Sequence, residues 1–140
     1  MNEASHLGLL IARTGLVLGK AVEKEFETAN LDLTYQHFIF LNVLSKGNKL
    51  IQQDLADIVK IDKSAVLRVI AALEEKKLVE RTGDTCDRRK KTLHLTALGK
   101  TLLKQALQIE HRINTKLQDG LAKEEVDTFV KVALHFRNKV

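Results

Sequence analysis

Basic side chains are concentrated in one segment of this 140-residue chain. Residues 60–100, the basic block, contain 11 Lys and Arg against 6 Asp and Glu, whereas the other 99 residues contain 12 of each. The whole net charge of +5 therefore lies in 41 residues. Such a localised charge is typical of a surface that binds a polyanion, with a merely solvated basic face as the alternative.

The densest part of the basic block is a run of four cations behind one carboxylate. Its members are Asp87, Arg88, Arg89, Lys90 and Lys91. This run suits contact with phosphates or with a minor groove, because arginine gains from the negative potential of a narrow minor groove. We expect Asp87 to orient a neighbouring guanidinium rather than to neutralise it. A disordered basic loop would carry the same sequence.

The segment 63–76 predicts a helix with two different faces. Val66, Val69, Ile70 and Leu73 fall on one side at 100° per residue and should be buried. The opposite side carries Ser64, Arg68, Ala71 and Glu75, flanked by Ala65 and Ala72. Short side chains would let this face approach a major groove closely, with Arg68 reaching a guanine edge. The predicted DNA-contacting residues of this helix are Lys63, Ser64, Ala65 and Arg68. A solvated helix with one incidental arginine is the alternative.

The elements that must position these residues follow from apolar spacing and from turn residues. Helices are predicted over residues 4–29, 34–45, 51–59, 63–76, 97–118 and 123–138, with Thr34, Asp62 and Thr96 as N-caps. The third and fourth of these helices meet across residues 60–62, which is a helix-turn-helix arrangement. Residues 79–81 and 91–95 predict a β-hairpin with the charged run in its tip. The chain should be mainly helical, since it has no proline and seven glycines.

The first and last helices carry more apolar side chains than one small core needs. Leu9 and Leu16 fall off the main stripe of the first helix, and Leu103 and Leu107 lie beside that of the fifth. We expect the last helix to bury Val126, Phe129, Val130, Ala133 and Phe136. The surplus predicts pairing of two chains, and a closed two-fold dimer is the usual form of such pairing.

The order of these elements and several local motifs resemble the MarR family of winged-helix transcription regulators. The motifs are Leu33-Thr34, Gln53-Asp54-Leu55-Ala56, Lys63-Ser64-Ala65-Val66, the segment 73–81, Asp87-Arg88-Arg89, and Leu95-Thr96-Ala97-Leu98-Gly99. The resemblance implies a single MarR-like domain over 1–140. In it, a winged helix-turn-helix at about 34–95, with a small β-hairpin wing, is flanked by dimerisation helices at about 4–29 and 97–138.

The same resemblance implies a function. Such a protein would be a sequence-specific homodimeric repressor that binds a pseudo-palindromic operator in double-stranded DNA. Relatives often lose DNA affinity when they bind a small anionic aromatic effector or are oxidised. Two departures concern the backbone, because Lys60 and Lys77 stand where glycine is often found. If the left-handed backbone is kept there, each lysine costs roughly 1 kcal/mol.

The resemblance also implies an effector pocket between the dimerisation helices and the winged part. Its candidate residues are Arg13, Tyr35, His37 and His111. Arg13 is a lone cation within an apolar segment, and it could pair with a ligand carboxylate. Equally, it could bridge to Glu25, to Glu27 or to an acid of a partner chain.

The sequence predicts no catalytic residues, no metal site and no cofactor. Its five histidines form no i, i+4 pair, and it has no phosphate-binding glycine loop and no nucleophile elbow. The single Cys86 is expected to be exposed and incidental. No apolar run approaches the roughly 18 residues of a membrane span, so we expect a cytoplasmic protein without a membrane partner. A dimeric winged-helix module that binds an acidic protein is the alternative function.

Overall fold

The computed structural model describes residues 3–83 and 86–140, with the side chains of residues 5–83, 86, 87 and 89–140. Within that part the chain is mainly helical and has one two-stranded antiparallel sheet, so the predicted fold class is confirmed. The chain divides into two compact units, Met1–Ile109 and Glu110–Val140, and each is described by itself.

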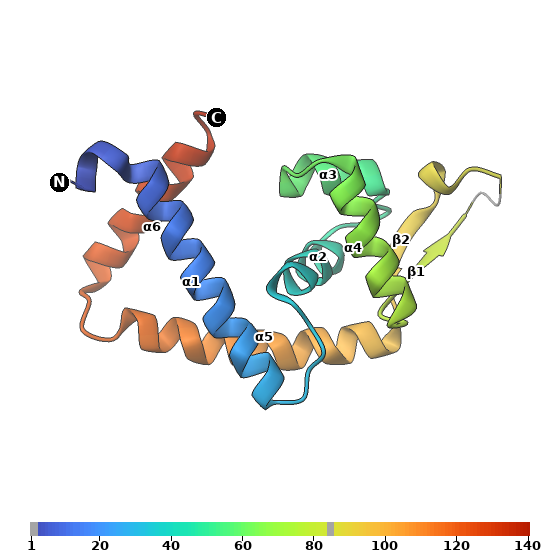
Figure 1. Cartoon of the computed structure of the whole chain (residues 1–140), viewed down its shortest axis with the longest axis horizontal. Coiled ribbons are helices and arrows are strands. Elements are labelled where there is room, and N and C mark those ends of the chain that lie inside the picture. Colours follow the sequence, from blue (N-terminus) through green and yellow to red (C-terminus); the bar gives the residue numbers. More distant parts are fainter. Residues whose placement is uncertain (1–2, 84–85) are drawn as a thin grey trace. The chain divides into compact units, whose positions relative to one another are not determined.

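The helices follow the predicted order (Figure 1). The first unit holds α1 (Leu7–Thr28), α2 (Tyr35–Lys46), α3 (Gln52–Val59), α4 (Lys63–Glu75), β1 (Val79–Thr82), β2 (Thr92–Leu95) and the first part of α5 (Ala97–Gln118). The second unit holds the end of α5 and α6 (Lys123–Arg137). Two 3-10 turns complete the described part, η1 (Glu3–His6) and η2 (Arg88–Lys90). The first α-helix thus begins at Leu7 rather than at residue 4.

Helix α2 is the centre of the first unit, because it contacts α1, α3, α4 and β2. Phe38, Phe40, Leu41 and Leu44 are its buried residues, and Ile39 is half-buried. The largest fully buried side chains come from several elements: Phe26, Phe40, Leu41, Leu55, Val66, Ile70, Leu73 and Leu78. The helix-turn-helix therefore packs onto an apolar core to which the neighbouring elements contribute.

Polar side chains fix where three of the helices begin. Thr34 Oγ1 accepts a hydrogen bond from the His37 N–H at 3.0 Å, and Asp62 Oδ1 accepts one from the Ala65 N–H at 2.8 Å. Thr96 Oγ1 accepts one from the Gly99 N–H at 3.0 Å. Each bond satisfies a backbone donor that the first helical turn leaves unpaired. All three predicted N-caps are confirmed.

Left-handed residues fix where three helices end. Asn30, Lys60 and Lys77 have φ values of 58°, 62° and 59°. At the end of α4, the Leu78 N–H donates to the Leu73 carbonyl oxygen and the Lys77 N–H donates to the Glu74 carbonyl oxygen, both at 2.9 Å. This is the helix ending that usually has glycine at the left-handed position. Both lysines therefore have the left-handed backbone conformation that glycine adopts without strain.

The apolar stripe of α6 is not buried within the chain, contrary to the prediction. Phe129 is 66% exposed, Val130 is also exposed, and Val126, Ala133 and Phe136 are only half-buried. The unit Glu110–Val140 has too few residues to enclose a core of its own.

The off-stripe leucines divide into two groups. Leu9 and Leu16 are exposed, as expected, and Leu107 is partly exposed. Leu103 is only 4% exposed, because it packs into the core of the first unit together with Ala106 and Ile109. Leu103 is therefore not part of the apolar surplus. None of the helices in the described residues is long and apolar enough to cross a membrane.

Candidate nucleic-acid interface

Helices α3 and α4 pack against each other on either side of the turn at residues 60–62 (Figure 1). The left-handed Lys60 ends α3, and its N–H donates to the Ala56 carbonyl oxygen at 3.0 Å. Two residues later, Asp62 begins α4. This tight connection sets the angle at which α4 leaves the body of the unit, as in other helix-turn-helix pairs.

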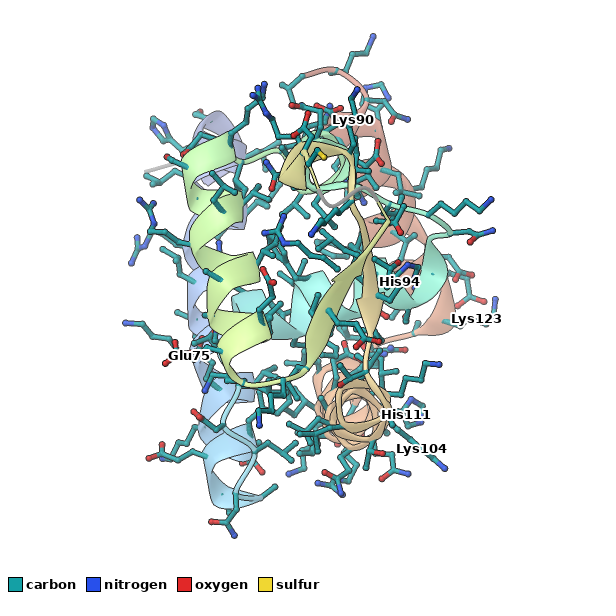
Figure 2. All side chains as sticks on the ribbon, turned by 90° about the vertical axis from the view of Figure 1, so that its right-hand side faces the viewer. Glu75, Lys90, His94, Lys104, His111 and Lys123 are labelled. Atoms are coloured by element: carbon teal, nitrogen blue, oxygen red, sulfur yellow. The ribbon has the colours of Figure 1, made fainter. Side chains whose placement is uncertain are left out.

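Helix α4 shows the two faces that the sequence predicts. Val66, Val69, Ile70 and Leu73 are its buried residues. Ser64, Arg68, Ala71 and Glu75 are all exposed, and Ala65 and Ala72 are half-buried at the margins. In Figure 2, Glu75 points away from the hairpin, which marks the side of α4 that this exposed face occupies. The exposed face is small apart from Arg68 and Glu75.

The start of α4 is held by a local hydrogen-bond network. The Ser64 hydroxyl donates to Asp62 Oδ1 at 2.5 Å. This bond lowers the pKa of the Asp62 carboxyl, and the bond from the Ala65 N–H lowers it further by a smaller amount. Ser64 therefore presents an acceptor oxygen rather than a hydroxyl proton to its surroundings. Lys63 and Arg68 are exposed, and no ion pair joins either of them to another described residue.

One exposed residue of α4 is missing from the predicted site. Leu67 is 43% exposed and lies one position before Arg68. Helical spacing places it between Lys63 and Ala71, one turn from each. The signal that could have found it is its absence from the buried stripe, since a leucine outside that stripe must face either solvent or a partner.

The hairpin forms a wing beside α4, with the predicted strands in antiparallel register. Its pairs are Val79 with Leu95, Glu80 with His94, Arg81 with Leu93, and Thr82 with Thr92. The Leu93 N–H also donates to the Leu50 carbonyl oxygen at 2.8 Å, which ties β2 to the segment before α3. The hairpin is thus attached to the helix-turn-helix at its base, while its tip extends away (Figure 1).

The tip is organised by Asp87. Its Oδ1 accepts a hydrogen bond from the Arg89 N–H at 2.9 Å and lies 3.8 Å from Arg89 Nε. The Arg89 guanidinium remains largely exposed, and Lys90 is exposed at the tip, as Figure 2 shows. Lys91 is half-buried. The predicted contact of Arg88 concerns a side chain that lies outside the described residues.

Arg81, in β1, is a charged residue of the wing to which sequence reasoning gave no role. Its Nε donates to Glu74 Oε1 at 3.0 Å, and its Nη1 donates to Gln52 Oε1 at 3.2 Å. The strand period could have found it, because Arg81 lies in phase with the buried Val79.

Two candidate effector residues take part in packing and capping at the start of α2. Tyr35 packs against Gly19, where an added Cβ would lie 3.2 Å from the ring, and its N–H donates to Glu23 Oε1 at 2.7 Å. His37 Nδ1 accepts a hydrogen bond from the Thr34 N–H at 3.2 Å, which completes a capping box. Burial, and then the positive charge of Lys76, lower the pKa of His37.

The other two candidates are exposed. Arg13 lies on α1 and forms no ion pair among the described residues. A bridge to Glu25 or Glu27 within α1 is ruled out, because 12 residues of helix span about 18 Å. His111 belongs to the unit Glu110–Val140, whereas Arg13, Tyr35 and His37 belong to Met1–Ile109. In the part of the chain that the structure describes, no three His, Cys, Asp or Glu side chains could hold a metal ion, and Cys86 is exposed.

Comparisons with known proteins point to one family. The MarR family model matches residues 31–90. The chain is 26% identical to a MarR/EmrR family transcriptional regulator from Acinetobacter sp. ADP1, over 99% of this chain and 97% of that one, with a TM-score of 0.86.

Two structures of protein–DNA complexes share the fold. One is the S. aureus MepR–DNA complex, with 24% identity, a TM-score of 0.80 and 99% of both chains covered. The other is a MarR family regulator from Listeria monocytogenes complexed with a 26mer DNA, with 23% identity and a TM-score of 0.80 over 92% of this chain and 85% of that one.

Proposed function

Because the chain belongs to the MarR family of transcription regulators, we propose that it is a sequence-specific, homodimeric DNA-binding repressor. It would act in the cytoplasm, without catalysis, on a pseudo-palindromic operator. The observation that carries this proposal is the combination of a small-residue face bearing Arg68 on α4 with exposed cations on the neighbouring wing.

The two parts would read DNA in different ways. Arg68 would donate to a guanine edge in the major groove, with Ala65 and Leu67 offering apolar contact to bases. Lys63 would contact the DNA backbone or bases at the start of the helix. Ser64, whose hydroxyl proton is donated to Asp62, would accept a hydrogen bond from a base amino group. The wing residues Arg88, Arg89, Lys90 and Lys91 would contact phosphates or the adjacent minor groove, with Asp87 orienting Arg89. MepR and the Listeria protein, which share this fold, form complexes with DNA.

The dimer would be built from the terminal helices. Leu9 and Leu16 on α1 and Phe129 on α6 expose large apolar side chains that no segment of the chain covers among the described residues. Burial of such side chains against a second copy removes apolar surface from water. A two-fold dimer presents two copies of α4, which is why we propose two symmetric half-sites. Repression would follow when the bound dimer occupies a promoter.

We extend the proposal to release by a small anionic aromatic molecule. Arg13 offers an exposed cation for a carboxylate, and Tyr35 offers a half-buried ring. His37 would contact such a ligand only by leaving its capping box. Benzoate is the simplest probe. It should weaken DNA binding by the parent protein and not by an Arg13→Ala variant.

A selection from a random duplex pool tests the central proposal. The parent protein should enrich a two-fold symmetric sequence and bind it at least a hundredfold more tightly than random duplex. Equal affinity for heparin and for the selected duplex would instead favour an acidic protein partner. Sedimentation should show a dimer at micromolar concentration, and a monomer would contradict the symmetric operator.

A further inference from the structure

A largely buried cation joins the wing to both helices of the helix-turn-helix. Only 10% of the Arg81 side chain is exposed. From β1 it reaches Glu74 in the last turn of α4 and Gln52 in the first turn of α3. One side chain therefore connects three elements, and its contact with Gln52 spans 29 residues of sequence.

The position of Arg81 in its strand is one that usually holds an apolar residue. Side chains alternate along a strand, and Val79, two residues earlier, is buried, whereas Glu80 and Thr82 are exposed. A cation on the inner side is stable only where its N–H groups find acceptors. Glu74 and Gln52 supply those acceptors, so Arg81 adds a defined direction to this contact as well as burial.

The chemistry of the guanidinium suits such a role. Its donors lie in one plane at fixed angles, so two acceptors on two helices fix its orientation, which a lysine ammonium would not do. Among the described residues, the hairpin is also held by its four residue pairs, by the bond from the Leu93 N–H to the Leu50 oxygen, and by burial of Val79 and Leu93. The exposed cations Arg89 and Lys90 lie beyond those pairs.

We propose that Arg81 is a positioning residue for DNA binding, an inference that rests on the proposed function. Through Glu74 and Gln52 it holds the wing at the distance from α4 at which Arg89 and Arg68 reach the same duplex. Arg81 itself does not touch the DNA.

A double-mutant cycle tests this coupling. Arg81→Gln, Arg89→Ala and the double variant are titrated against the duplex selected from a random pool by the parent protein. Arg81→Gln should weaken binding about tenfold, and Arg89→Ala, which costs several-fold in the parent, should cost less than about twofold in the Arg81→Gln background. If the double variant lost affinity by the full product of the two single losses, the proposal would be overturned, because the wing contact would then be independent of Arg81.

A matched pair of variants separates position from charge. Glu74→Ala and Glu80→Ala each remove one carboxylate near the wing, and by charge alone each should strengthen binding to a polyanion. Glu80 is exposed on the other side of β1 from Arg81. The proposal expects Glu74→Ala to weaken binding to the selected duplex at least about threefold and Glu80→Ala not to weaken it. Equal affinities of the two variants would contradict it.

Hydrogen exchange in the DNA-free protein separates failure of this inference from failure of the proposed function. Arg81→Gln should speed exchange of the Leu93 amide at least about tenfold, while the Ile70 amide in α4 stays unchanged, because the wing would open locally. Arg81→Lys should not restore protection. If the parent selects no duplex, DNA binding fails, yet this measurement still decides whether Arg81 holds the wing. Unchanged exchange at Leu93 would overturn the positioning role.

Discussion

Replacing Lys60 and Lys77 with glycine should stabilise the protein. Both lysines have a left-handed backbone, with φ of 62° and 59°. That conformation costs a residue with a Cβ about 1 to 2 kcal/mol. Glycine avoids this cost but loses about 0.5 to 1 kcal/mol more conformational entropy on folding. The net gain should be about 0.5 to 1 kcal/mol of unfolding free energy for each substitution.

The two gains should add, because the residues end different helices and share no hydrogen-bond partner. The double variant should then gain about 1 to 2 kcal/mol, which corresponds to a rise in Tm of about 3 to 7 °C. Urea unfolding at a fixed protein concentration measures the gain, since the stability of a dimer depends on concentration.

Alanine at the same two positions is the matched control. Lys60→Ala and Lys77→Ala remove the same charges but keep a Cβ, so the backbone cost should remain and stability should change little. If the alanine variants were stabilised as much as the glycine variants, relief of charge repulsion would explain the effect. The argument from backbone conformation would then be refuted.

Three further predictions concern packing, pH and base readout. Gly99→Ala should lower the unfolding free energy by about 1 to 3 kcal/mol, because an added Cβ would lie 2.1 Å from the Leu78 carbonyl oxygen; an unchanged urea midpoint would contradict this close contact. His37 has a lowered pKa and accepts the N-cap N–H through its neutral ring, so the unfolded chain takes up the proton first and stability should fall as pH drops below about 6.5. His37→Gln, which keeps a capping-box acceptor, should lose this part of the pH dependence of stability. If this variant kept the parent's pH profile, the pH dependence would come from another group. Arg68→Ala should cost about 1 to 3 kcal/mol per half-site and relax base preference at one symmetric position, whereas Arg89→Ala should weaken binding to A·T-rich flanks only. Competition between selected and random duplexes measures both, and an unchanged ratio for Arg68→Ala would remove it from base readout.

Local rules were sufficient to predict the helix-turn-helix and its faces. The caps at Thr34, Asp62 and Thr96 depend on side chains that bond within three residues, so the sequence contains the whole interaction. The buried stripe of α4 follows from helical period alone. The two strands of the wing likewise follow from the alternation of apolar and polar residues in two short segments.

Features that depend on contacts between distant segments could not be predicted in this way. Leu103 lies off the main stripe of its helix, yet it is buried, because the core of the first unit covers it. The role of Arg81 depends on its hydrogen bond to Gln52, which lies 29 residues away in the sequence. No local sequence pattern indicates that contact. The sequence predicts His37 as a pocket residue, whereas its capping bond depends on the geometry of the Thr34 backbone, which the sequence does not give.

The salt dependence of DNA binding tests the central claim most directly. If three or four cations per chain contact phosphates, a dimer neutralises about six to eight, and log affinity for the selected duplex should fall with log salt at a slope of about −5 to −7. Replacing Lys90 and Lys91 together with alanine should make the slope shallower by about two to four units, the lower value applying if the half-buried Lys91 contributes little. The ratio of selected to random binding should stay nearly the same. A slope near −1 on the best selected duplex, or a slope that the double substitution leaves unmoved while binding stays measurable, would contradict DNA binding through α4 and the wing.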